Sequence, residues 1–125
     1  MPIIDHLTLR VKDLAMSKSF YEKALAPLGF GVQMEWQGFV GFGPSGKPSF
    51  WIAPLEKDQA SAISHIAFGA KSRAEVDAFH AAALEAGGRD EGKPGLREHY
   101  HPGYYGAFVF DPDGNNIEAV THKPE

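Results

Sequence analysis

The sequence contains no cysteine, which excludes disulfide bonds, thiolate metal ligands and a cysteine nucleophile. It has no run of basic residues, and 12 Lys and Arg against 16 Asp and Glu give a net charge of −4. This balance argues against a nucleic acid or a membrane as the main partner. No apolar stretch approaches the roughly 20 residues of a membrane-spanning helix, and the first residues do not resemble a signal peptide. We therefore expect a cytoplasmic protein that acts on a small molecule.

The predicted elements occur twice in the same order. Apolar and polar residues alternate over 3–11 and again over 64–69, which predicts a strand in each segment. A helix is predicted after each strand, the first from Asp13 to about Leu28 and the second after the Ser72 and Glu75 capping box. Three short strands follow each helix, near 30–36, 38–43 and 48–53, and near 94–100, 104–110 and 115–121.

A shift of 59 residues aligns the two halves of the chain. It places His6 on His65 and Gly29 on Gly88, and it also matches apolar positions of the strand and of the helix. Such a run of matches indicates an internal duplication of residues 1–58 and 59–125 within one domain, residues 1–125. The fold class is predicted to be α+β: two βαβββ modules form an eight-stranded mixed sheet that curls around a cleft, with both helices on the outer face.

Strand alternation selects the residues that face this cleft. His6 and Thr8 face it from the first strand, His65 from its repeat, and Glu118 from the last strand. Two imidazoles and one carboxylate on rigid strands can bind Fe, Mn, Ni, Co or Zn and leave coordination positions open for substrate. Taken singly, each of these side chains is more often an ordinary hydrogen-bonded polar residue, but the repeat favours a divalent metal site.

The segments 5–14 and 64–68, together with the Asp-Pro-Asp-Gly-Asn turn of 111–115 that leads to Glu118, resemble the vicinal oxygen chelate superfamily. This group contains glyoxalases, bleomycin-resistance proteins and dioxygenases. The resemblance covers essentially the whole chain and implies paired βαβββ modules with a metal held by His6, His65 and Glu118. It also implies a substrate bound through neighbouring oxygen atoms, for which Glu118 or a metal-bound water is the base.

The sequence departs from individual members of this group. Trp51 stands where glyoxalase I usually has a fourth ligand, and Phe108 stands where ring-cleaving dioxygenases have a Tyr. The basic clamp of the thiol transferases has no match near the C-terminus. Bleomycin-binding members generally lack the ligand set that this chain retains.

Residues 97–106 concentrate histidine and tyrosine between two strands that flank the expected site. His101 and Tyr104 are candidate catalytic groups, since His titrates near neutral pH and a Tyr hydroxyl is a donor. The candidate substrate-binding residues are Thr8, Trp51, His99, Tyr100 and Tyr105. An equally weighted alternative is an aromatic loop that packs on its neighbours or at a dimer interface.

The sequence thus predicts a metal-dependent homodimer that acts on a small oxygenated substrate, first as a glyoxalase-like lyase or isomerase. An extradiol-type dioxygenase or a thiol transferase is the alternative on the same site. A non-catalytic protein that sequesters an aromatic compound in a dimer groove lined by Trp36, Trp51 and Tyr105 is the alternative from another class. Whether one chain or two build each site stays open.

Overall fold

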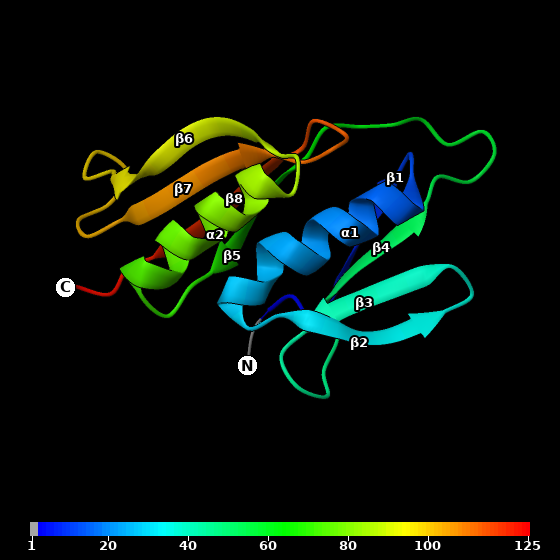
Figure 1. The fold of residues 1–125 in the computed structure, drawn as a ribbon, viewed down its shortest axis with the longest axis horizontal. Helices are drawn as coiled ribbons and strands as arrows, with labels where there is room; N and C mark the ends of the chain where they lie inside the picture. The colour runs from blue at the N-terminus through cyan, green and yellow to red at the C-terminus, as the bar shows by residue number, and fades with distance from the viewer. Residues whose placement is uncertain (1–2) are drawn as a thin grey trace.

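The computed structural model describes residues 3–125 and contains the predicted order of elements (Figure 1). The first half comprises β1 (Leu7–Val11), α1 (Leu14–Leu25), the 3₁₀ turn η1 (Ala26–Leu28), β2 (Gly31–Trp36), β3 (Phe39–Gly43) and β4 (Phe50–Pro54). The second half comprises β5 (His65–Gly69), α2 (Arg73–Glu85), β6 (Arg89–Leu96), β7 (Tyr105–Phe110) and β8 (Asn116–Thr121). Neither helix is long and apolar enough to cross a membrane.

Side-chain caps set the start of both helices as predicted. The Asp13 carboxylate accepts a hydrogen bond from the backbone N–H of Met16, and the Ser72 hydroxyl accepts one from that of Glu75. The first α-helix ends at Leu25 and continues as the 3₁₀ turn of Ala26–Leu28, in which Pro27 has no N–H to donate.

The strands form two four-stranded sheets with the same internal order, β1-β4-β3-β2 and β5-β8-β7-β6. In each sheet the first strand of the module runs parallel to the last, and the remaining pairs are antiparallel. This confirms the α+β class and the two βαβββ modules. The eight strands are divided between two sheets, because among the described residues β1 pairs only with β4 and β5 only with β8.

The two modules share one hydrophobic core on the helix side of both sheets. The helices α1 and α2 pack against each other and lie side by side in Figure 1. Phe50 of β4 and Phe68 of β5 meet edge to face, with ring centroids 5.1 Å apart. Because the helix-covered faces meet in this core, the opposite face of each sheet is left open, and the polar residues selected by strand alternation lie there.

The Asp-Pro-Asp-Gly-Asn turn joins the second module to the first. The buried Asp111 carboxylate accepts a hydrogen bond of 2.5 Å from the hydroxyl of Tyr21, which is buried in α1. Asp113 accepts a hydrogen bond from the backbone N–H of Lys12, and Asn115 accepts one from that of Ser64. Since β8 starts directly after this turn, the same contacts fix the strand that carries Glu118.

The strand predicted near 94–100 lies five residues earlier, at Arg89–Leu96. Its glycines and Pro94 are typical of a turn, but the structure accommodates them as irregularities on an edge strand, which within residues 3–125 pairs only with β7. Residues 97–104 consequently form the connection to β7, and His99, Tyr100 and His101 lie on this connection.

Candidate functional site

The open face of the second sheet holds a polar cavity of about 260 Å³, which we name the Glu118 cavity. Its lining residues are His65, Glu91, Arg97, Tyr100, Tyr104, Phe108, Asn116 and Glu118. Parallel pairing of β5 with β8 places His65 beside Asn116 and Ala67 beside Glu118. Strand alternation therefore brings His65 and Glu118 to the same face, as the sequence predicts.

Glu118 is a buried carboxylate, with only 1% of its surface exposed. Its Oε1 lies 2.8 Å from Nε2 of His65, and its Oε2 accepts a hydrogen bond from the Tyr104 hydroxyl. No Lys or Arg of residues 3–125 forms an ion pair with it. Buried carboxylates are normally paired with a cation or bound to a metal, so the chemistry of this group suits a divalent ion.

Tyr104 is held as a neutral hydrogen-bond donor. Burial of its hydroxyl, followed by the hydrogen bond to Glu118, raises its pKa well above the usual value. Gly106 makes this contact possible: a Cβ there would lie 3.1 Å from the Tyr104 ring and 3.3 Å from Oε2 of Glu118. The hydroxyl therefore remains protonated at neutral pH and acts as a hydrogen-bond donor to Glu118.

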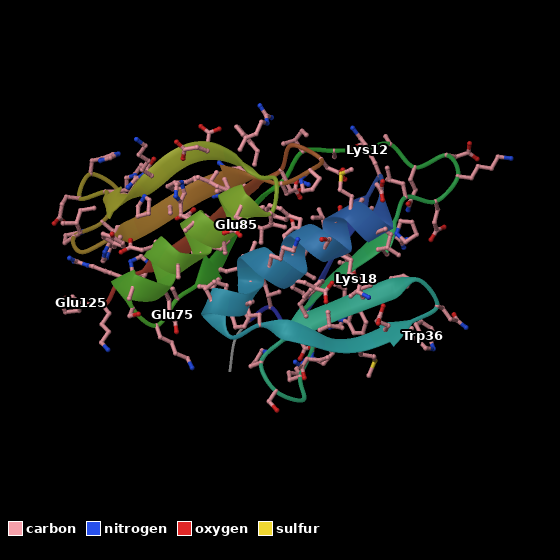
Figure 2. The ribbon with its side chains drawn as sticks, viewed as in Figure 1. Lys12, Lys18, Trp36, Glu75, Glu85 and Glu125 are labelled. Atoms are coloured by element: carbon pink, nitrogen blue, oxygen red, sulfur yellow. The ribbon has the colours of Figure 1, made fainter. Side chains whose placement is uncertain are left out.

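The open face of the first sheet holds a second cavity of about 360 Å³, which we name the Trp51 cavity. It is lined by His6, Thr8, Trp36, Phe39, Lys47, Pro48 and Trp51. Parallel pairing of β1 with β4 places Thr8 beside Trp51. The indole lies over Gly41, where an added Cβ would come within 2.9 Å of it. Trp36, 60% exposed, lies at the end of β2 (Figure 2).

His6 lies just before β1 and is exposed. Its Nδ1 is 2.8 Å from Oδ1 of Asp5, which also accepts a hydrogen bond of 3.0 Å from Nζ of Lys47. These two contacts hold the pKa of the Asp5 carboxyl below its ordinary value. The Asp5 contact orients the imidazole, and Nε2 is left as the nitrogen available to a ligand.

The three predicted metal ligands are not united within one chain. His65 and Glu118 lie together in the Glu118 cavity, whereas His6 lines the Trp51 cavity, and the two cavities have no residue in common. Within residues 3–125, no group of three His, Asp or Glu side chains is arranged to hold a metal ion. A single chain therefore offers two of the three ligands at one place.

The remaining candidate residues are divided between the cavity and its surroundings. Tyr100 lines the Glu118 cavity and stacks on the exposed His99, with ring centroids 4.3 Å apart. The Nδ1 of His101 lies 2.8 Å from the carbonyl oxygen of Pro102, at the surface. Tyr105 is on the opposite face of β7 and donates a hydrogen bond of 2.6 Å to Asp77 of α2. Tyr105 is therefore outside both cavities, and the dimer groove predicted from Trp36, Trp51 and Tyr105 stays a prediction.

Arg97, Phe39 and Lys47 are cavity residues that sequence reasoning did not select. Arg97 lies in a segment that was predicted as a strand near 94–100, and Lys47 lies between the strands predicted near 38–43 and 48–53. The neighbouring Gly92 and Gly95 were the available signal for Arg97, because glycine within a strand indicates a close approach of another group.

A family model for the Glyoxalase/Bleomycin resistance protein/Dioxygenase superfamily matches residues 3–119. The chain belongs to this superfamily. It is 33% identical to a glyoxalase/bleomycin resistance protein from Albidiferax ferrireducens T118, with a TM-score of 0.84, and 98% of this chain and 100% of that chain are covered. A family enzyme from Burkholderia phytofirmans PsJN is 19% identical with a TM-score of 0.72, covering 94% and 96% of the two chains, and shows the fold alone. No protein of curated function matches the sequence.

Proposed function

We propose that this superfamily member is a metal-dependent enzyme that acts on a small oxygenated substrate, with lyase or isomerase chemistry of the glyoxalase-like type. The observation that carries the proposal is the buried carboxylate of Glu118, whose partners are a His ring and a Tyr hydroxyl. The alternatives on the same site are a dioxygenase and a thiol transferase, and the dioxygenase differs from the first choice at Phe108. Phe108 in the Glu118 cavity favours the first choice, since the resemblance associates a Tyr at this place with the dioxygenase.

We further propose that the active unit is a homodimer in which His6 of a second copy completes the ligand set of His65 and Glu118. Each open face carries only part of this set. In a two-fold dimer, the open face of the first sheet of one copy would lie against the open face of the second sheet of the other copy, and symmetry would repeat this contact. The start of β1 supports a contact between copies, because Ile3, Ile4 and Leu7 are exposed by 101%, 70% and 40%. Covering such apolar side chains stabilises an interface.

In this assembly the chain's own residues bind and orient the substrate. A divalent ion held by the two His and Glu118 would supply a Lewis acid toward the substrate's oxygen atoms. Tyr104 holds a proton next to Glu118, within reach of the same cavity. Thr8 and Trp51 line the facing cavity, where the indole excludes water and provides an apolar wall.

The test is complementation between two inactive variants. His6→Ala and Glu118→Gln should each lose most of the bound metal. When the two variants are co-expressed with different affinity tags free of histidine, the mixed dimer should recover about half of the wild-type metal content, because one of its two sites is intact. Elemental analysis of the doubly tagged species measures this recovery, and circular dichroism checks that each variant folds.

The matched control carries both substitutions in one chain and is paired with the wild-type chain. Its mixed dimer would have one defect in each shared site and should bind no metal at full affinity. If this control binds metal while the first mixture does not, each site is built from one chain. If wild-type protein binds no transition metal, the metal-dependent function itself is wrong.

A second candidate function is the sequestering of an aromatic compound without chemistry. The aromatic wall of the Trp51 cavity, formed by Trp36, Phe39 and Trp51, favours it. The two functions differ in their need for metal. Stoichiometric metal in the purified protein supports the enzyme, and its absence together with tight binding of aromatic compounds supports the sequestering protein.

A further inference from the structure

The guanidinium of Arg97 is fixed within the Glu118 cavity by backbone carbonyl groups. Its Nη1 donates hydrogen bonds to the carbonyl oxygens of Gly95 at 2.7 Å and Gly106 at 3.3 Å. Its Nη2 donates to the carbonyl oxygen of Lys93 at 2.8 Å. The guanidinium also lies over the Phe108 ring, with its Cζ 5.3 Å from the ring centroid, a distance at which a cation–π contact is favourable. Arg97 therefore has one well-defined position.

The backbone of β6 is shaped to accept this side chain. A Cβ at Gly92 would lie 3.1 Å from Nη2 of Arg97, and a Cβ at Gly95 would lie 3.2 Å from Nη1. The pairing of β6 with β7 shifts register on both sides of Gly92, so the strand bends at this point. Two glycines and an irregular strand thus provide the space that the guanidinium occupies.

One edge of the guanidinium remains for a ligand. Of its five N–H groups, the carbonyl oxygens use three, which leaves the N–H of Nε and one N–H of Nη2. These two nitrogens lie on the same side of the group and form the fork that pairs with two carboxylate oxygens. Within residues 3–125, no Asp or Glu forms an ion pair with Arg97.

We propose that Arg97 binds the carboxylate of the substrate through this edge, so that the substrate of the Glu118 cavity is a small 2-oxo or 2-hydroxy carboxylic acid. Glu91 and Glu118 line the same cavity and repel an anion. A carboxylate can therefore be paired in this cavity only at Arg97, the lining residue with a permanent positive charge. A volume of about 260 Å³ suits an acid of a few carbon atoms. The oxygen next to the carboxylate would be the one presented to the metal, and this part of the assignment rests on the proposed function.

The test uses pyruvate as the probe and hydroxyacetone, which keeps the ketone but lacks the carboxylate, as its control. The full-length protein is titrated as purified and also with a chelator, and the Nε–H resonance of Arg97 is followed by NMR. Pyruvate should move this resonance in a saturable way in both preparations, whereas hydroxyacetone should not. Equal responses to the two compounds, or no response to pyruvate, would overturn the proposal.

Three variants test the geometry of the fork. Arg97→Lys keeps the charge but loses the fork, and it should weaken pyruvate binding about tenfold or more. Gly95→Ala retains the Arg97 side chain, but its added Cβ would lie 3.2 Å from Nη1 and displace the guanidinium, so it should weaken pyruvate binding as well. Arg89→Lys, at the start of β6, is the matched control, since this guanidinium lies over the Phe110 ring outside the cavity, and it should bind pyruvate like the wild type.

The outcomes separate this proposal from the proposed function. Loss of pyruvate binding only in Arg97→Lys and Gly95→Ala, with metal content unchanged, supports the carboxylate site. Pyruvate binding by a protein that holds no transition metal as purified, and takes up none when metal is added, supports Arg97 and contradicts the metal-dependent function. If Arg97→Lys binds both metal and pyruvate like the wild type, the carboxylate site is contradicted and the metal-dependent function is not.

Discussion

Replacing Asp111 by Ala should lower the free energy of unfolding by about 3–4 kcal/mol, because it leaves several buried donors without an acceptor. Besides the Tyr21 hydroxyl, the Asp111 carboxylate accepts hydrogen bonds from the backbone N–H groups of Asp113 and Asn115 and from the Asn115 side chain, all within 2.9 Å. Tyr21 is fully buried, and burial, followed by its contact with Asp111, raises the pKa of its hydroxyl well above the usual value. The hydroxyl is therefore a neutral donor that has no water to replace Asp111.

The control for this prediction lies two residues away in the same turn. Asp113→Ala removes one hydrogen bond from the exposed backbone N–H of Lys12 and should cost about 1 kcal/mol or less. Urea denaturation of both variants, followed by circular dichroism, measures the two free energies. Similar losses in the two variants would show that the turn acts through its backbone and that the link from Asp111 to Tyr21 contributes little.

The hydrogen bond from Tyr21 to Asp111 joins the two modules. Asp111→Ala should therefore also disturb the Glu118 cavity, which does not contain Asp111. Asn116 and Glu118 follow the turn on β8, and their position depends on how the turn rests on α1. Under conditions in which the variant remains folded, metal content should fall below that of Asp113→Ala. Unchanged metal content in the folded variant would show that β5 and β7 alone are sufficient to position β8.

The sequence was sufficient to predict which face of β1, β4, β5 and β8 is open. Each sheet is buried on one side only, so the apolar residues of a strand identify its core face and the polar residues its open face. Ile117 and Ala119 are fully buried on the core side of β8, and Glu118 between them reaches the Glu118 cavity. The helix caps and the order of elements within each module depend on residues that are close in the sequence. They could therefore be recognised without the structure, and they identified the two modules.

The direction in which the two open faces point was not predictable from strand alternation. It depends on long-range packing, in which Phe50 and Phe68 from different modules share one core. An alternating pattern selects a face, but it contains no information on how one module is rotated against the other. His6 and His65 are equivalent in the repeat and nevertheless line different cavities. Arg97 was missed for a related reason, since its position follows from the irregular pairing of β6.

Replacing Trp51 by Glu should raise metal affinity by about tenfold or more, because a second carboxylate strengthens the attraction for a divalent cation. Trp51 lies beside Thr8 in the sheet and shares its cavity with His6, so a side chain at this position lies on the same open face as that proposed ligand. An indole has no lone pair to offer a metal, whereas a carboxylate does. Metal dissociation constants obtained by competition with a chromophoric chelator measure the change.

Trp36→Glu is the matched control for this experiment. It introduces the same charge into the same cavity, but at the exposed end of β2 (Figure 2), and it should leave metal affinity nearly unchanged. Any long-range effect of the added charge is common to both variants, so their difference isolates direct ligation at position 51. The tryptophan fluorescence of the wild-type protein should also respond to metal, and Trp36→Phe should retain this response. Equal affinities in Trp51→Glu and Trp36→Glu, with fluorescence insensitive to metal, would place Trp51 away from the metal, and the Trp51 cavity would then not face the ion in the dimer.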